Sequence, residues 1–211
     1  MNLHVLCTNH ELKLDLFDQY REEDWIGVDK GTLILLQNDI RPIAAFGDFD
    51  SCSVDELDYI KSKIEIEQLP PEKNETDLEV ALQFTTQLGY RKVFIHGATG
   101  KRLDHFLGNL QTLLHQDVLL SETEYYIVNE DNTISVLTTG THIIEKESDK
   151  QYVSFMPIND GVKITIEDLK YNVEQYEIRF GLTRTVSNEF VSERGTITIE
   201  NGMVYMIQSR A

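Results

Sequence analysis

The chain has few of the residues that build unusual frameworks. Its 211 residues include two cysteines, four prolines and twelve glycines, which excludes a disulfide framework and a collagen-like or low-complexity structure. Cys7 and Cys52 are also too few to form a four-ligand zinc site by themselves. The remainder is an ordinary mixture, 41% hydrophobic and 26% charged, and is long enough to bury a core in one or two small domains.

Long hydrophobic runs are missing as well. No stretch approaches the roughly 18 apolar residues that span a membrane, so we expect no membrane partner. Residues 1–7 lack the cationic start and the apolar run of a signal peptide. Together with the scarcity of cysteine, these features predict a cytoplasmic protein.

Positive charge is scarce. There are 19 basic side chains against 36 acidic ones, a formal net charge of −17. Duplex nucleic acid would be repelled, because its binding depends on Lys and Arg contacts to phosphates, and we expect no nucleic-acid partner. A small anion can still bind where a divalent metal intervenes, and a cationic substrate would be attracted.

The first part of the chain, up to about residue 122, alternates strand-like and helix-like patterns. Ser53 and Thr76 each begin a Ser/Thr-x-x-Glu capping box, and a further helix begins near Asp104. Residues 12–20 fit a helix only moderately, and residues 32–37 are ambiguous. Strand-like runs occupy residues 3–7, 25–28, 43–46 and 93–96. This alternation predicts a largely parallel sheet with helices on its faces.

The pattern changes to strands after that point, and it predicts a second, all-β domain from roughly residue 140 to residue 211. Glu200-Asn201-Gly202 predicts a hairpin turn between two of these strands, since Asn-Gly supplies positive φ. The strand-like runs are residues 125–128, 133–137, 152–157, 162–166, 175–180, 196–199 and 203–207.

The sharpest local motif is Gly47-Asp48-Phe49-Asp50-Ser51, directly after a strand-like run. Ligands of open α/β sheets bind beyond the carboxyl ends of strands. Two unneutralised carboxylates about 5 Å apart would repel by roughly 3 kcal/mol at an effective dielectric of about 20, and a bound Mg²⁺ would convert this repulsion into attraction. On the motif alone, a solvated acidic turn that leads into a capped helix is an equally good interpretation.

Other segments present aspartates at similar places. Asp29 closes the second strand, and Asp77 opens a helix, where anions are favoured. In the Gly-rich turn 97–100 and its continuation, Arg102 offers a forked donor for phosphate and Asp104 is spaced to cap the next helix. Lys73 could also reach a phosphate. The turn is neither a Walker A loop nor a dinucleotide fingerprint.

As an ordered set, these motifs resemble those of thiamine pyrophosphokinases, over essentially the whole chain. Two positions depart from the family pattern. Cys7-Thr8-Asn9-His10 stands where a Gly-Gly pair is common, and Lys101 replaces a common glycine. The set is Gly27-Val28-Asp29-Lys30-Gly31, Gly47-Asp48-Phe49-Asp50-Ser51, Lys73-x-x-Thr76-Asp77-Leu78-Glu79, Gly97-x-x-Gly100-x-Arg102-x-Asp104-His105-x-x-x-Asn109 and Ser187-Asn188-Glu189.

The resemblance implies a fold and a site. The fold is α/β, with an N-terminal Rossmann-like parallel-sheet domain for nucleotide, residues 1–135, and a C-terminal β-sandwich for thiamine, residues 140–211. It also implies a homodimer with sites between the subunits. Asp48, Asp50 and Asp77 would hold Mg²⁺ on the phosphates of ATP, and Ser187 and Asn188 would hold the thiamine pyrimidine. The implied nucleotide or phosphate contacts are Asp29, Lys73, Thr76, Arg102, Asp104 and Asn109.

The implied reaction is Mg-dependent transfer of the pyrophosphoryl group of ATP to the thiamine hydroxyl, giving thiamine diphosphate and AMP. Asp48, Asp50, Asp77 and Arg102 would position the reactants and offset charge, with Asp77 or Asp50 as candidate proton acceptors.

Two other functions stay open. One is a phosphatase that uses the first aspartate of Asp-x-Asp as nucleophile, although Cys52 stands where such enzymes usually have Thr or Val. The other is a non-catalytic module that binds nucleotide or metal and has a regulatory role.

Overall fold

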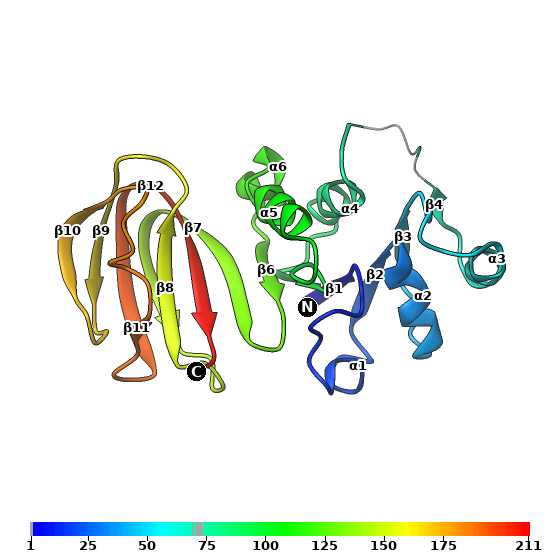
Figure 1. The fold of residues 1–211 in the computed structure, drawn as a ribbon, viewed down its shortest axis with the longest axis horizontal. Coiled ribbons are helices and arrows are strands. Elements are labelled where there is room, and N and C mark those ends of the chain that lie inside the picture. Colours follow the sequence, from blue (N-terminus) through cyan, green and yellow to red (C-terminus); the bar gives the residue numbers. More distant parts are fainter. Residues whose placement is uncertain (1, 69, 71–73) are drawn as a thin grey trace. The chain divides into compact units, whose positions relative to one another are not determined.

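The computed structural model describes residues 2–68, 70 and 74–211. Its contacts divide the chain into two compact units, one ending at Glu130 and one beginning at Asp131 (Figure 1). Among the described helices, none is long and apolar enough to cross a membrane. The functional division into residues 1–135 and 140–211 stays a prediction.

The first unit contains a parallel sheet in the order β6-β5-β1-β2-β3-β4. Apart from the two-residue β4, its strands are largely buried apolar segments, as expected where helices cover a parallel sheet. The predicted alternation of strands and helices is therefore confirmed for this unit. The strands are β1 (Asn2–Leu6), β2 (Asp24–Val28), β3 (Ala44–Gly47), β4 (Glu67–Gln68), β5 (Lys92–His96) and β6 (Glu124–Val128).

The helices of this unit begin close to the predicted positions. The capping box at Ser53 is present: the backbone N–H of Glu56 donates to the Ser53 hydroxyl at 3.3 Å, and the Glu56 carboxylate accepts from the Ser53 N–H at 2.8 Å. The ambiguous run at 32–37 is helical, whereas the moderate pattern at 12–20 yields four helical residues. The helices are α1 (Leu16–Gln19), α2 (Lys30–Gln37), α3 (Val54–Lys63), α4 (Asp77–Thr85), α5 (Leu103–Thr112) and α6 (Gln116–Leu120).

Helix α2 is pressed against the end of the neighbouring strand. A Cβ on Gly31 would lie 1.9 Å from the carbonyl oxygen of Leu6, so only glycine permits this approach. Leu33 on the same helix is buried with Phe49 and Ile60 in one apolar cluster. This packing fixes the chain that leaves β2 and the turn that follows β3.

The second unit is built from antiparallel strands. β12 pairs with β7 over most of its length, while its first half also pairs with β9 and its second half with β8. The apolar faces of these strands form one core that includes Phe155, Ile164 and Ile197. The strands are β7 (Asn132–Glu145), β8 (Tyr152–Pro157), β9 (Val162–Glu167), β10 (Val173–Ile178), β11 (Asn188–Glu189) and β12 (Arg194–Ser209).

The hairpin predicted at Glu200-Asn201-Gly202 is wrong. The chain does not reverse there: β12 continues through these residues, and its register against β7 shifts between Ile199 and Met203. Gly202 has φ +88°, and a Cβ there would lie 2.6 Å from the Asn159 side chain. The Asn-Gly pair therefore lies in a β-bulge, a feature that also uses positive φ. A bulge bends a strand and does not end it.

Two histidines of neighbouring strands, His4 on β1 and His96 on β5, are buried side by side. Nδ1 of His4 lies 2.9 Å from Nε2 of His96, and Nε2 of His4 lies 3.1 Å from the Glu23 carboxylate. Because an ionised carboxylate only accepts, His4 donates from Nε2 to Glu23 and accepts at Nδ1 from His96. Burial lowers the pKa of His4, against the opposing effect of Glu23. Burial and the neighbouring His4 and Lys13 charges lower the pKa of His96 further.

We predict that His4 and His96 each titrate below the ordinary histidine pKa of about 6.5, because burial disfavours their charged forms. Their folded pKa values lie below the unfolded value, so the stability that this pair contributes is present above about pH 6.5 and is lost as the pH falls. Imidazole NMR resonances followed from pH 8 to pH 5 measure this directly. A midpoint at or above 6.5 for either ring in the folded protein would contradict it, and the chain in concentrated urea supplies the reference titration.

Candidate active site

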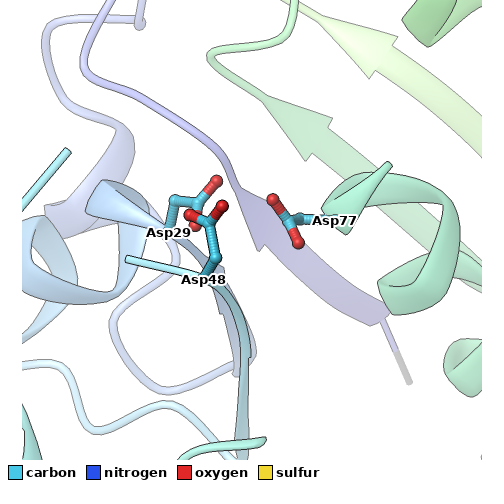
Figure 2. Close-up of side chains that lie close together, drawn as sticks. All are labelled: Asp29, Asp48 and Asp77. Atoms are coloured by element: carbon cyan, nitrogen blue, oxygen red, sulfur yellow. The ribbon is translucent and has the colours of Figure 1, made fainter. Parts of the chain in front are cut away.

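Three aspartates from separate segments converge at the carboxyl edge of the parallel sheet. Asp29 follows β2, Asp48 follows β3, and Asp77 is the first residue of α4. One carboxylate oxygen of each lies within 4.8 Å of the others, and all three residues are half-buried. Figure 2 shows the Asp77 carboxylate turned toward the pair formed by Asp29 and Asp48. Parallel strands end at the same edge, which explains why residues so far apart in sequence meet here.

The backbone around Asp29 is unusual and depends on a glycine. Asp29 has φ +47° and ψ −123°, a conformation that L-residues with a side chain rarely adopt. Its Oδ1 accepts a hydrogen bond of 3.2 Å from the Phe49 N–H. A Cβ on Gly47, which has φ +150°, would lie 2.1 Å from the same oxygen. Gly47 therefore makes room for the Asp29 carboxylate, and the buried Phe49 ring anchors the turn.

The three carboxylates make the site strongly electronegative. Burial raises the pKa of Asp29 to about 7, and the charges of Asp77 and Asp48 add to this effect. A pair of ionised carboxylates at this separation repels by about 3 kcal/mol at an effective dielectric of about 20. A hard divalent cation would remove that repulsion, and three convergent carboxylate oxygens suit Mg²⁺ when substrate phosphates and water complete its shell.

Asp50 lies outside this group of three. Its side chain is exposed, and its backbone N–H donates to Oδ1 of Asp48 at 3.0 Å. Asp29, which the sequence predicts as a nucleotide contact, lies in the group instead. Its position directly after β2, at the same edge as Asp48, is the signal that could have suggested it. The individual ligand roles of these four aspartates stay predictions.

The Gly-rich turn 97–100 lies after β5 at the same edge of the sheet. Arg102, just beyond it, donates to the Asp104 carboxylate at 3.2 Å from Nε and at 2.6 Å from an Nη. The Arg102 guanidinium lowers the pKa of Asp104 to about 2. Both side chains are exposed, and exposed ion pairs are weak, so Arg102 can exchange this partner for a phosphate at little cost.

The other predicted nucleotide contacts have local partners. The Thr76 hydroxyl accepts from the Glu79 N–H at 3.2 Å and caps α4. The Asn109 amide donates to the carbonyl oxygen of Ala98 at 2.8 Å, inside the Gly-rich turn. Lys73 lies outside the described residues.

In the second unit, the buried Asn188 side chain is held by backbone groups. Its Oδ1 accepts from the N–H groups of Tyr171 at 3.0 Å and Glu189 at 2.9 Å, and its Nδ2 donates to the Tyr171 carbonyl at 2.8 Å. Ser187 has φ +58°, and its backbone N–H donates to the Ser154 hydroxyl at 2.9 Å.

A cavity of about 350 Å³ lies beside Asn188 in this unit. Arg184 at its wall stacks over the Tyr176 ring at 4.7 Å, and Lys170 pairs with Glu189 at 2.7 Å. The lining residues are Ile166, Lys170, Tyr171, Asn172, Val173, Arg184, Thr185 and Asn188. The volume suits a small heterocyclic ligand.

Two family models match the chain in the same order as its two units. The thiamin pyrophosphokinase catalytic domain matches residues 18–126, and the thiamin pyrophosphokinase vitamin B1 binding domain matches residues 141–204. A thiamine pyrophosphokinase of Bacillus subtilis is 38% identical over 187 residues, which cover 88% of this chain and 86% of the relative. The chain belongs to the thiamin pyrophosphokinase family.

Solved structures agree with this membership. The structure of the thiamine pyrophosphokinase of Bacillus subtilis matches with a TM-score of 0.89 at 34% identity. The match covers 100% of this chain and 99% of the Bacillus subtilis chain. The corresponding protein of Geobacillus thermodenitrificans has a TM-score of 0.87 at 32% identity, covering 100% and 98%. The shared family and fold make the acidic group and the cavity the natural candidates for the substrate sites.

We predict that Asp29→Asn stabilises the metal-free protein at pH 8 by about 1–2 kcal/mol, a figure discounted for partial exposure. The pKa of Asp29 lies above the unfolded value, so the ionised carboxylate lowers stability above about pH 7 and this effect fades as the pH falls toward 4. Urea unfolding in a chelator measures the gain, with the exposed Glu65→Gln as control.

The same Asp29→Asn variant should lose most of the rise in melting temperature that Mg²⁺ gives the parent protein, because one carboxylate of the group is gone. A variant that is less stable without metal, or that keeps the full response to Mg²⁺, would contradict this interpretation of Asp29.

Proposed function

We propose that this chain catalyses Mg-dependent transfer of the pyrophosphoryl group of ATP to the hydroxyl of thiamine, giving thiamine diphosphate and AMP. The observation that carries the proposal is the group Asp29, Asp48 and Asp77 at the carboxyl edge of a parallel sheet, in a member of the thiamin pyrophosphokinase family. That edge is where phosphate-bearing ligands of such sheets bind.

Asp48 and Asp77 would hold Mg²⁺ on the ATP phosphates, with Asp29 completing the convergent set. Asp50 adds a fourth carboxylate in the adjoining turn, exposed and therefore accessible to a nucleotide-bound metal. When bound, Mg²⁺ offsets the negative charge of the phosphates and of the carboxylates. The raised pKa of Asp29 supports this assignment, since such a shift marks a site prepared for positive charge.

Arg102 would turn from Asp104 toward the transferred phosphates, where its forked donors match two oxygens. Thr76 and Asp104 would contact the nucleotide, and Lys73, from outside the described residues, would contribute a further cation. We assign Asn109 an indirect part, because its amide already holds the Gly-rich turn through the carbonyl of Ala98.

The second unit would receive thiamine. Ser187 and Asn188 border the strand pair β8 and β11, and the cavity beside Asn188 has room for the pyrimidine ring. On this proposal the first unit is the Rossmann-like nucleotide domain and the second is a β-sandwich that binds thiamine. The change of partner along β12, from β9 in its first half to β8 in its second half, supports that architecture.

In the proposed reaction, the hydroxyl oxygen of thiamine attacks the β-phosphorus of ATP. The bond from that phosphorus to the oxygen bridging the α- and β-phosphates breaks, and AMP leaves with the electron pair. The thiamine hydroxyl proton is released, with Asp77 or Asp50 as its first acceptor. The chain's residues otherwise position the two substrates and stabilise charge.

We further propose a homodimer with sites between the subunits and a cytoplasmic location. The dimer rests on the family resemblance, and the location rests on composition.

The activity is tested by incubating the full chain with ATP, Mg²⁺ and thiamine. We expect thiamine diphosphate and AMP in equal amounts, and we expect Asp48→Asn or Asp77→Asn to reduce turnover at least about 100-fold because each removes a ligand of the cation. Thermal melting should show that both variants remain folded.

The matched control is Asp58→Asn, an exposed aspartate on α3 that should keep normal turnover. Release of inorganic phosphate through a phosphoaspartyl intermediate would favour the phosphatase instead. Near-normal turnover in both Asp48→Asn and Asp77→Asn would contradict the metal site.

Asn188→Ala tests the thiamine side. Loss of the amide frees the Tyr171 backbone groups beside the cavity, so we expect the KM for thiamine to rise about tenfold while the KM for ATP changes less than twofold. Steady-state kinetics with each substrate varied in turn measures this. Asn201→Ala, in the bulge of β12, is the control, and an equal rise in both KM values would argue against a thiamine site here.

A further inference from the structure

A closed ring of three hydrogen bonds links the loops after three parallel strands. The Thr99 hydroxyl donates to Oε2 of Glu11 at 2.6 Å. The Asn129 amide donates to the same carboxylate oxygen at 3.0 Å and to the Thr99 hydroxyl at 3.0 Å. Each of the three side chains thus contacts the other two.

The ring joins segments that are distant in sequence. Glu11 lies in the loop after β1, Thr99 in the Gly-rich turn after β5, and Asn129 directly after β6. Asn129 is buried, and its amide nitrogen donates to both other side chains of the ring. The backbone N–H of Glu130 also donates to the carbonyl oxygen of Glu11 at 3.0 Å. This is a second link between the loop after β1 and the segment after β6.

The rest of the Gly-rich turn is anchored as well. The Thr8 hydroxyl donates to the carbonyl oxygen of Gly97 at 3.0 Å, and the Asn109 amide donates to that of Ala98 at 2.8 Å. A Cβ on Gly100 would lie 2.6 Å from the Cβ of His10, so the loop after β1 lies directly against the turn. Every residue from 97 to 100 is therefore contacted from outside the turn, and three of them, Gly97, Thr99 and Gly100, meet the loop after β1.

We propose that Glu11 is a positioning residue for nucleotide binding, which acts by holding the turn 97–100 and thereby the start of the segment that carries Arg102. The inference rests on the proposed function, because that segment is where ATP phosphates would be bound. Glu11 itself is exposed, so its main effect is on the order of the loop and only slightly on the core. A loop fixed before the ligand arrives loses less entropy on binding and holds its donors in register.

The test measures binding of Mg-α,β-methylene-ATP, an analogue whose α,β bond is not broken, to the full chain by calorimetry. Glu11→Ala and Thr99→Val each open the ring, and we expect each to weaken the Kd roughly tenfold. The double variant should bind no more weakly than Glu11→Ala alone, since both changes break the same ring. Glu11→Gln keeps an acceptor oxygen and should restore most of the affinity.

The exposed Glu122→Ala is the matched control and should bind as the parent does. A purely structural role would lower the melting temperature and raise the KM for thiamine and for ATP alike, whereas we expect the KM for thiamine to stay within twofold. Three results would each overturn the proposal. They are unchanged nucleotide binding in Glu11→Ala and Thr99→Val, additive losses in the double variant, and no nucleotide binding by the parent. If the parent binds the analogue but makes no thiamine diphosphate, the proposed function fails while the role of Glu11 stands on the Kd values.

Discussion

Mutual repulsion between Asp29, Asp48 and Asp77 is the constraint around which the first unit is built. Three carboxylates that share a space of 4.8 Å oppose one another by about 3 kcal/mol per ionised pair. The fold holds them together with a glycine that makes room for Asp29, a buried Phe49 ring and a helix packed onto a strand end at Gly31. On the proposed function, a bound Mg²⁺ would offset this repulsion and make the arrangement a binding site.

The same repulsion lowers the stability of the metal-free protein at the place where the proposed function needs negative charge. Burial and neighbouring charge keep Asp29 from ionising at its usual pH in the metal-free protein. Each unit has an asparagine amide that donates to a backbone carbonyl: Asn109 to Ala98 in the first unit, and Asn188 to Tyr171 in the second. In both units, asparagine amides shape the loops beside the candidate sites. On the proposed function, the aspartates would bind the cation, while the neutral asparagine amides hold the loop backbone in place.

Much of the architecture follows from the sequence, and the misses have physical causes. Strand ends and helix starts depend on short-range patterns, so the positions of Asp48 after β3, of Asp77 at the start of α4 and of the helix at Ser53 could be predicted. The bulge at Gly202 could not, because positive φ fits a turn and a bulge equally well. The position of Asp29 directly after β2 hints at its inclusion in the acidic group, but its exact placement depends on a strained backbone that the sequence pattern does not reveal. The ring of Glu11, Thr99 and Asn129 depends on strand order, which brings segments more than a hundred residues apart into contact.

The most direct test of the account is to locate the cation itself. Crystals of the full chain grown with Mn²⁺ and α,β-methylene-ATP would give an anomalous signal for the metal. The account predicts a peak among Asp29, Asp48 and Asp77, within about 2.2 Å of carboxylate oxygens from at least two of them and in contact with phosphate oxygens. A metal peak bound to nucleotide elsewhere, with these three carboxylates left unligated, would contradict it.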